Sequence, residues 1–284
     1  ENDVYGKVSP KRMLTTTIGD EMQLFSDAKV IGISIKDRGA ILAAGHSADA
    51  AYWMNAEGKW ISSTYYMKQL PKWLQEVNKK DNVKKYMSGS WKLKDEFTYN
   101  LDTLLRINGR GQIKKTPFGN SILNDLAINI LKEEKLGKNK TTDFLAVSFS
   151  STDYIGHQYG PHSSELFDTY VRLDKDIAKL LKVLDSKVGI ENIVVFLTSD
   201  HGVVSQPSNL IAKNIPAGYF DKTTINSSLK NYLNKKLGDS EWILNYSNNQ
   251  FFLNRELIEK SEFALGYVQQ ICADFLINID GIKN

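Results

Sequence analysis

The sequence predicts an α/β protein in which a mostly parallel sheet is flanked by helices and carries an inserted cap lobe. Three short apolar runs rich in β-branched residues, at residues 30–35, 144–149 and 193–197, lie between turn signals. Runs of this kind are typical of strands buried inside a parallel sheet. An amphipathic helix is expected between the second and third runs, so the connection should be a βαβ crossover with parallel strands.

The first helix and the first strand begin the predicted sheet. Ser9 followed by Pro10 predicts a helix that has Ser9 as its N-cap and Pro10 in its first turn. The run 30–35 follows this helix and ends at a charged turn that begins with Lys36. A helix followed directly by a strand is half of a βαβ unit.

A cap lobe inserted in the main sheet is expected over residues 45–115. Apolar and aromatic residues on both sides of Glu57 and Gly58 predict a hairpin, and a polar, Lys-rich segment with scattered Trp and Tyr follows. The aromatic side chains predict a small core for this lobe, with a wall of the substrate site as the alternative.

The second half of the chain contains the clearest helical patterns. Residues 117–134 predict a helix with apolar side chains every four positions. A longer amphipathic helix follows a cap at Ser163 or Ser164, and its apolar positions step by four and three: Leu166, Tyr170, Leu173, Ile177, Leu180 and Leu184. The other elements expected are two helices and one strand, at residues 223–237, 263–277 and 250–253.

Composition excludes several classes of protein. Of the 284 residues, 42% are hydrophobic and 24% are charged, which is ordinary for a globular chain and excludes a disordered one. The net charge of +3 is small, so no nucleic-acid partner is expected. No apolar run approaches the roughly 20 residues that span a bilayer, so no membrane span is expected. Cys272 is the only cysteine and is interpreted as an inert core residue, and the oligomeric state stays open.

Two carboxylates and two imidazoles follow the second and third predicted strands. Asp153 and His157 come shortly after one strand, and Asp200 and His201 come directly after the other. Parallel strands end at one rim of an open α/β sheet, and ligands bind beyond that rim. Oxygen and nitrogen donors of this kind suit zinc or a similar divalent ion.

The alternative interpretation is that these side chains only form turns and local hydrogen bonds. Convergence of two such pairs on one rim favours a metal site over that alternative. A catalytic zinc usually has about three protein ligands, so two ions need more than the four donors identified. His46 and His162 are weaker candidates, because a lone histidine is more often structural.

The motifs around these residues resemble the alkaline-phosphatase superfamily. The similarity is to its type I phosphodiesterase/nucleotide pyrophosphatase branch, and within that branch to bacterial alkaline phosphatases of the phosphate-irrepressible type. The segments that carry it are Thr15-Thr16-Thr17-Ile18-Gly19-Asp20, Lys36-Asp37-Arg38-Gly39-Ala40-Ile41, Gly45-His46-Ser47-Ala48, Ser150-Ser151-Thr152-Asp153-Tyr154-Ile155-Gly156-His157 with Gly160-Pro161, and Ser199-Asp200-His201-Gly202.

The resemblance implies a zinc-dependent phosphoric monoester hydrolase that acts on small phosphorylated substrates. It implies two zinc ions, one bound by Asp153 and His157 and the other by Asp200 and His201. It also implies that Lys36 contacts the transferred phosphoryl group together with Arg38, and that the protein is periplasmic or secreted.

The chain departs from the family pattern in one respect. The family's nucleophilic Thr or Ser, with an Asp ligand, lies upstream of the segment that resembles Ser9-Pro10, and a third His lies far downstream of His201. We therefore expect an interior fragment, an incomplete alkaline-phosphatase-like α/β domain over residues 1–284, that contains no catalytic nucleophile and is inactive by itself.

Three other functions are compatible with parts of this sequence pattern or scaffold. A type I phosphodiesterase/nucleotide pyrophosphatase is the alternative within the branch. A sulfatase would need a Cys or Ser followed by Pro and Arg, which the segment at Cys272 does not offer. A degenerate, non-catalytic metal-binding domain is the alternative from another class.

Overall fold

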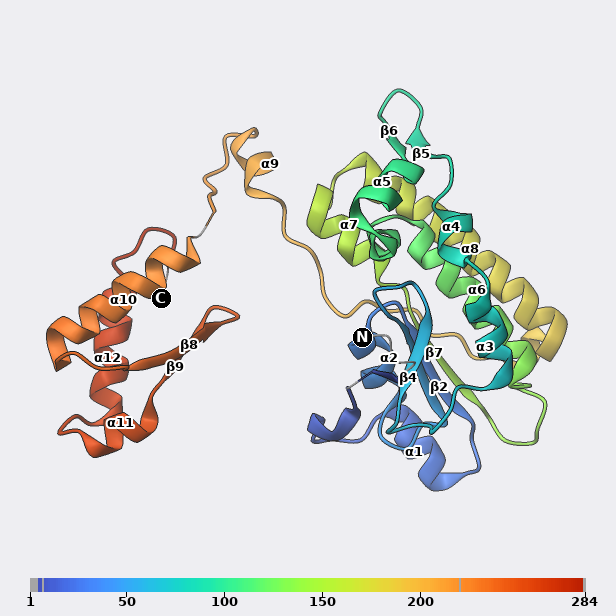
Figure 1. Cartoon of the computed structure of the whole chain (residues 1–284), viewed down its shortest axis with the longest axis horizontal. Helices are drawn as coiled ribbons and strands as arrows, with labels where there is room; N and C mark the ends of the chain where they lie inside the picture. The colour runs from blue at the N-terminus through green and yellow to red at the C-terminus, as the bar shows by residue number, and fades with distance from the viewer. Residues whose placement is uncertain (1–4, 7, 220, 283–284) are drawn as a thin grey trace. The chain divides into compact units, whose positions relative to one another are not determined.

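A computed structural model describes residues 5–6, 8–219 and 221–282, which fold into two compact units (Figure 1). The first unit is Glu1–Ser205 and the second is Gln206–Asn284. All the candidate site residues lie in the first unit. The sequence predicted one incomplete α/β domain over residues 1–284, and this domain assignment remains a prediction.

A five-stranded sheet forms the centre of the first unit. Its strands lie in the order β1, β4, β3, β2, β7, with the bounds Tyr5–Gly6, Trp60–Ser63, Ala50–Met54, Val30–Ser34 and Phe144–Ser148. Three of its pairings are parallel, and only β3 and β4 are antiparallel. The predicted α/β class with a mostly parallel sheet is therefore confirmed.

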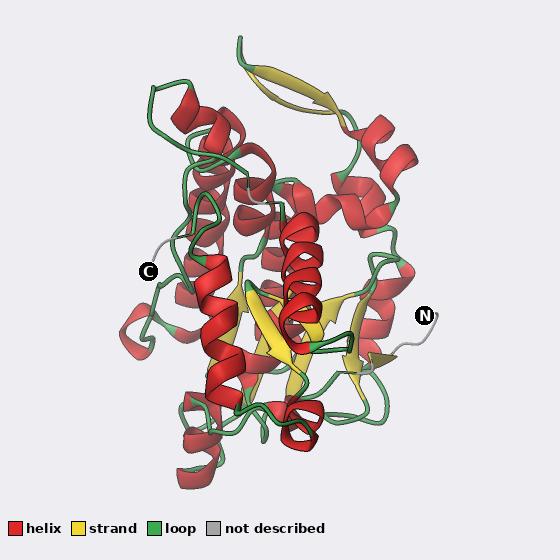
Figure 2. Ribbon diagram, turned by 90° about the vertical axis from the view of Figure 1, so that its left-hand side faces the viewer, coloured by secondary structure: helices red, strands yellow, loops and turns green. Residues whose placement is uncertain are grey.

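Helices supply most of the regular structure (red in Figure 2). In the first unit they are α1 (Ile18–Phe25), α2 (Asp37–Ala44), α3 (Lys72–Lys79), α4 (Asn82–Tyr86), α5 (Leu101–Asn108), α6 (Phe118–Glu133), α7 (Ser151–Tyr159) and α8 (Ser164–Val188). The 3₁₀ turns η1, η2 and η3 span Pro10–Arg12, Arg110–Lys115 and Ile190–Asn192, and the small hairpin of β5 and β6 spans Ser90–Leu93 and Phe97–Asn100.

The two faces of the sheet are covered by different helices. Ile31 and Ile33 pack in one core with buried residues of α6, while Val30 packs in a second core with residues of α2. This alternation follows from the two-residue period of a strand. Helix α2 lies so close to β2 that a Cβ at Gly32 would come within 2.4 Å of the Ala40 carbonyl oxygen. The packing therefore requires glycine at this position.

The first helix begins later than the sequence predicted. Ser9 and Pro10 start only the 3₁₀ turn η1, and α1 begins at Ile18 with Thr17 as its N-cap. The Thr17 side chain accepts from the Asp20 N–H, and the Asp20 side chain accepts from the Thr17 N–H, which is a capping box. The prediction at Ser9 was wrong because Ser9 makes no capping hydrogen bond.

Asp20 joins the start of α1 to the loop after α2. Asp20 is 3% exposed, and its carboxylate accepts hydrogen bonds from Thr17 and from the Ser47 N–H and hydroxyl, the last two at 2.7 Å. His46 lies at the edge of this network, with its Nδ1 3.4 Å from Asp20 Oδ2 and its Nε2 3.1 Å from the Met13 carbonyl oxygen. Burial opposes the charge, but the hydrogen bonds outweigh it and hold the pKa of Asp20 far below its ordinary value of 3.8.

Replacing Asp20 by alanine is therefore expected to lower the free energy of unfolding by about 3 kcal/mol, because several buried donors lose a charged acceptor. A lowered carboxyl pKa stabilises the fold fully at pH values above the ordinary pKa, and this stabilisation is lost progressively as the pH falls from the ordinary pKa toward the lowered pKa of the folded state. The difference from wild type, measured by urea denaturation, should therefore shrink below about pH 4. The exposed Asp27→Ala variant is the control, and an equal effect of both substitutions would contradict the role of the network.

The hairpin around Glu57 and Gly58 is confirmed, but it belongs to the main sheet. Strands β3 and β4 form it, and each also pairs with another strand of the five-stranded sheet. Strands β3 and β4 lie within the range 45–115 that was predicted as a cap lobe, but they are part of the main sheet. Trp91, an aromatic residue of the predicted lobe, is buried in the same core as Ile31 of the main sheet. The boundaries of the lobe remain a prediction.

The strand predicted at residues 193–197 does not form. The segment has no regular secondary structure, and Val194, Phe196 and Leu197 are 79%, 84% and 82% exposed. Helix α8 does form, with Ser163 as its N-cap, but within the described residues no strand follows it in the main sheet. The prediction was wrong because a strand needs a hydrogen-bonded neighbour, and no strand in the described part of the chain pairs with this run.

The second unit has a core of its own. It contains α9 (Pro207–Ile211), α10 (Lys222–Leu237), the hairpin of β8 (Ile243–Ser247) and β9 (Gln250–Leu253), α11 (Arg255–Lys260) and α12 (Leu265–Leu276). The two predicted helices and the predicted strand are confirmed here. Cys272 lies in this core, and burial raises the pKa of its thiol to about 11, as expected of an inert residue. No helix in the described part of the chain has the length and apolar character needed to cross a membrane.

Candidate active site

The site begins where two neighbouring strands end. Strands β2 and β7 are parallel, and Ser34 pairs with Ser148 at their last residues. Lys36 follows β2 as the N-cap of α2, and Asp153 lies in the first turn of α7, directly after β7. The Lys36 ammonium forms an ion pair with Asp153 Oδ2, and only 15% and 23% of the two side chains are exposed. The sheet therefore brings together residues 117 positions apart in sequence.

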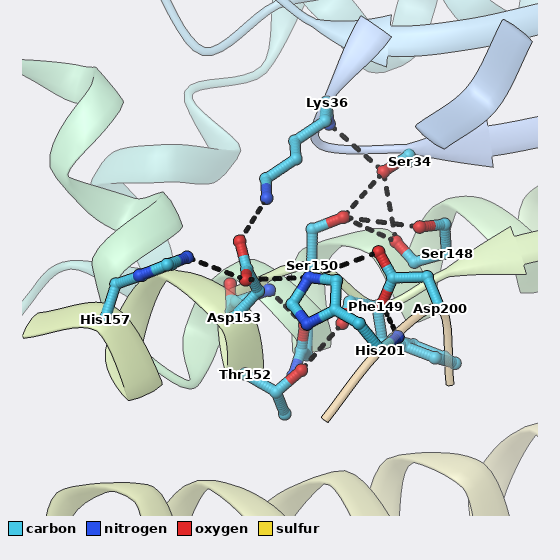
Figure 3. Close-up of polar contacts among 12 residues, drawn as sticks. Ser34, Lys36, Ser148, Phe149, Ser150, Thr152, Asp153, His157, Asp200 and His201 are labelled. Carbon is cyan, nitrogen blue, oxygen red and sulfur yellow. Dashed lines mark hydrogen bonds and ion pairs between the residues drawn. The ribbon is translucent and has the colours of Figure 1, made fainter. Parts of the chain in front are cut away.

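The predicted histidines gather around Asp153 (Figure 3). His157 lies one turn further along α7, and its Nε2 is 3.2 Å from Asp153 Oδ1. His201 reaches the same oxygen at 3.8 Å from the segment after residues 193–197. Asp200 is 88% exposed, and its Oδ2 is 3.6 Å from His201 Nε2. Asp153, His157 and His201 therefore lie together although the strand predicted before His201 does not form, and the Asp200 carboxylate contacts His201.

The charges in the site favour an ionised Asp153. Burial opposes its ionisation, but the Lys36 ammonium outweighs this effect, with smaller contributions from His157 and His201, and holds the pKa of the carboxyl below its usual value. The Gly202 carbonyl oxygen, 2.8 Å from His201 Nδ1, raises the pKa of that imidazole, and Asp200 adds to the effect. The site is thus an anionic carboxylate surrounded by cationic or polarisable groups.

Arg38 is the predicted site residue that lies apart. It is exposed in the first turn of α2, and its backbone N–H donates to Asp37 Oδ1 at 2.7 Å. Within the described residues, its guanidinium forms no ion pair with Asp153 or Asp200. His162, the other extra candidate, lies 3.4 Å from the Ser205 hydroxyl.

Three serines under the site were not among the predicted residues. The hydroxyls of Ser34 and Ser150 are 3.0 Å apart, and the hydroxyl of Ser148 is 3.3 Å from that of Ser150. Ser34 Oγ also accepts from the Lys36 N–H at 3.1 Å, so this cluster fixes the backbone that presents Lys36. A Cβ at Gly39 would lie 2.7 Å from Ser34 Oγ. The sequence signal that could have revealed this cluster is the serine at the carboxyl end of each strand, Ser34 in β2 and Ser148 in β7.

A tyrosine beside the site was also missed. The Lys36 ammonium lies 4.5 Å from the centroid of the Tyr154 ring. A cation over an aromatic face is held electrostatically, which limits where the ammonium can point. Tyr154 lies within the motif quoted for the resemblance, but its spacing alone does not reveal this contact.

The donor types at this site suit a divalent metal. One carboxylate oxygen of Asp153 faces two imidazoles, and nitrogen and oxygen ligands of this kind bind zinc. Asp153 also forms an ion pair with the Lys36 ammonium through its other oxygen. Across the described residues, no group of three or more His, Cys, Asp and Glu side chains has the arrangement of a metal site.

The chain is similar in sequence to a protein named as a calcium-transporting ATPase and to two named as alkaline phosphatases. The chain is 41% identical over 307 residues to a calcium-transporting ATPase of Myroides odoratus, covering 98% of this chain and 56% of that protein. It is 36% identical over 309 residues to alkaline phosphatase PhoV of Synechococcus elongatus, covering 98% and 55%. It is 34% identical over 295 residues to alkaline phosphatase PafA of Elizabethkingia meningoseptica, covering 93% and 53%. The chain thus spans little more than half the length of these relatives.

The fold is shared with a solved member of the same group. A crystal structure of wild-type alkaline phosphatase PafA matches with a TM-score of 0.90 and 32% identity, over 97% of this chain and 58% of that one. The alkaline-phosphatase-like fold expected from the resemblance is therefore confirmed.

The family itself follows from a match over most of the chain. The family model described as type I phosphodiesterase/nucleotide pyrophosphatase matches residues 3–268. The chain therefore belongs to the type I phosphodiesterase/nucleotide pyrophosphatase family, within the alkaline-phosphatase superfamily.

Proposed function

We propose that the longer protein containing this chain is a zinc-dependent phosphoric monoester hydrolase. The observation that carries the proposal is the convergence of Lys36, Asp153, His157 and His201 at the carboxyl rim of the sheet. Similarity to two alkaline phosphatases and to the PafA structure supports the same function. The expected substrate is a small phosphorylated molecule, and the expected location is the periplasm or the cell exterior.

The proposed zinc ligands are those that the resemblance implies. Asp153 and His157 would hold one ion, and Asp200 and His201 the other, with further ligands from outside these residues. Zinc supplies Lewis-acid stabilisation of oxygen atoms that gain negative charge during phosphoryl transfer. Ionised Asp153 suits this role, because a metal ligand must be deprotonated.

The chain's own contribution to the reaction is to hold the phosphoryl group. Lys36 already lies at the rim and can exchange its ion pair with Asp153 for a phosphoryl oxygen. Arg38, exposed on the same helix, can add a planar fork that binds two oxygens. Together they neutralise charge that builds up on the transferred group.

The nucleophile is proposed to be a Thr or Ser in the part of the protein outside these 284 residues. Its hydroxyl loses a proton and its oxygen bonds to phosphorus, while the P–O bond to the leaving alcohol breaks and that oxygen takes a proton. Water then attacks the phosphoenzyme, releases inorganic phosphate and restores the hydroxyl. A chain without this residue would bind the phosphoryl group but not transfer it.

A diesterase is the second candidate, because the family name includes phosphodiesterases. A monoester phosphoryl group has three free oxygens and two negative charges, whereas a diester has two oxygens and one charge. Two cationic side chains therefore favour monoesters.

The test is the ratio of kcat/KM for p-nitrophenyl phosphate to that for bis(p-nitrophenyl) phosphate in the full-length protein. We expect wild type to prefer the monoester and Arg38→Ala to reduce that preference by roughly 30-fold or more, since one charge-assisted contact is lost. Lys11→Ala, an exposed basic residue in η1, is the matched control. A wild-type preference for the diester, or equal loss of both activities in Arg38→Ala, would favour the diesterase.

A further inference from the structure

The Lys36 ammonium has two partners on α7 that differ in chemical kind. One is the Asp153 carboxylate, with which it forms an ion pair, and the other is the ring of Tyr154, whose centroid lies 4.5 Å from Lys36 Nζ. These partners are consecutive residues near the start of α7. Only 15% of the Lys36 side chain is exposed, so these two contacts determine where the ammonium lies.

The carboxylate is the partner for which the proposed reaction competes. Asp153 Oδ2 holds the Lys36 ammonium, while Oδ1 faces His157 and His201 at 3.2 and 3.8 Å. Binding of a divalent ion by Asp153 weakens the attraction between this carboxylate and Lys36, because the ion adds positive charge beside the ammonium. A phosphoryl oxygen also competes for the ammonium N–H groups. An ammonium held by Asp153 alone would therefore lose its anchor in the loaded site.

The Tyr154 ring is a partner that this competition leaves in place. An aromatic face attracts a cation through its quadrupole and is not a zinc ligand. An ammonium has three N–H donors, which can turn to other acceptors while the nitrogen stays over the ring. Lys36 Nζ also lies closer to its ring than Lys85 and Lys236, which are exposed and lie 5.6 and 5.7 Å from the centroids of other tyrosine rings.

The position of the ring is fixed by contacts that do not involve the Lys36 ammonium. The Tyr154 N–H donates to the Ser150 carbonyl oxygen at 3.3 Å, and its side chain packs against the main hydrophobic core. The Ser150 hydroxyl lies 3.0 Å from that of Ser34, which accepts from the Lys36 N–H. The start of α7 therefore holds Lys36 at both ends, the backbone through two serines and the ammonium through the ring.

We infer that Tyr154 is a positioning residue for phosphoryl transfer, whose ring keeps the Lys36 ammonium at the rim when Asp153 is committed to a metal ion. The inference deepens the proposed function and rests on it for the metal ion and the phosphoryl group. Tyr154 acts through Lys36 and does not itself bind the phosphoryl group. Its ring should therefore affect the reaction only while residue 36 carries a charge.

Nuclear magnetic resonance of the full-length protein with ¹³C-labelled lysine tests the contact without reference to activity. The ring current of Tyr154 should shift the signal of the Lys36 CεH₂ group upfield, and Lys36→Met identifies that signal. We expect the shift to persist when zinc and inorganic phosphate are added, to disappear in Tyr154→Leu and to remain in Tyr154→Phe. Loss of the shift on addition of zinc, or its retention in Tyr154→Leu, would overturn the inference.

A double-mutant cycle measures the effect of the ring on the reaction. Tyr154→Leu should lower kcat/KM for p-nitrophenyl phosphate by roughly 3- to 30-fold, the size of one cation–π contact. Tyr154→Phe keeps the ring and should recover most of this loss. In the Lys36→Met background, Tyr154→Leu should change kcat/KM by less than about twofold, since the ammonium is gone. The dissociation constant of inorganic phosphate should follow the same pattern.

Tyr232→Leu is the matched control, because Lys236 Nζ lies 5.7 Å from the centroid of the Tyr232 ring in the second unit. This substitution should leave kcat/KM and phosphate binding within about twofold of wild type. Equal losses from Tyr154→Leu with and without Lys36→Met would assign Tyr154 a packing role only and would overturn the inference. If the protein shows the shifted Lys36 signal but no monoesterase activity, only the proposed function fails.

Discussion

Replacing Asp153 by asparagine in the full-length protein is expected to reduce p-nitrophenyl phosphate kcat/KM by on the order of 10³-fold. Asp153 lies at the centre of the site, because its carboxylate contacts Lys36, His157 and His201. Asparagine keeps the size of the side chain but removes the negative charge that a metal ion requires. Bound zinc, measured by mass spectrometry of the metal, should fall with the activity.

The matched control is Asp143→Asn. Asp143 precedes β7 as Asp153 follows it, and its carboxylate accepts from the Lys29 and Gly137 N–H groups at 3.0 and 2.8 Å. This substitution should alter stability modestly and leave zinc content unchanged. If Asp153→Asn retains its zinc and loses less than about fivefold in kcat/KM, Asp153 is not a metal ligand.

Lys36→Ala is expected to cost about 2–4 kcal/mol of transition-state stabilisation, which is roughly 30- to 1,000-fold in kcat/KM for the monoester. Lys36 follows β2 at the rim, its side chain is only 15% exposed, and its ammonium is held by Asp153 and by the Tyr154 ring. Alanine removes the charge that would neutralise a phosphoryl oxygen. Inhibition by inorganic phosphate should weaken as well, because the product carries the same oxygens.

Lys29→Ala is the control for this prediction. Lys29 lies directly before β2 and pairs with Glu134 at 3.2 Å, so it is a lysine in an ion pair at the opposite end of the same strand. Its loss should leave kcat/KM within about twofold of wild type, as expected of a partly exposed ion pair. Equal losses in both variants would show that the effect is structural rather than local to the site.

The meeting of Lys36 and Asp153 could be predicted from the sequence because it depends on strand order alone. When two apolar runs form neighbouring parallel strands, the residues that follow them lie at the same rim of the sheet. The position of His157 follows from the same rule, whereas His201 reaches Asp153 from a segment that forms no strand. The exposure of Arg38 could not be predicted, because side-chain direction after the strand depends on where α2 begins.

The start of α1 was missed because two capping signals compete. Ser9 with Pro10 is a helix start by residue type, whereas Thr17 has Asp20 three residues later and makes the reciprocal hydrogen bonds. Residues 193–197 have the composition of a buried strand, but a strand forms only where a neighbouring strand is available for pairing. A local sequence pattern therefore does not predict contacts with distant segments of the chain.

Hydrolysis of p-nitrophenyl phosphate by the full-length protein and by the 284-residue chain, both with zinc in excess, is the most direct test. We expect turnover of about 1–100 s⁻¹ for the full-length protein, within the ordinary range of enzymes. We expect the 284-residue chain to be no faster than buffer, because the proposed nucleophile lies outside it. Turnover above about 1 s⁻¹ by the 284-residue chain, or none by the full-length protein, would contradict the proposed function.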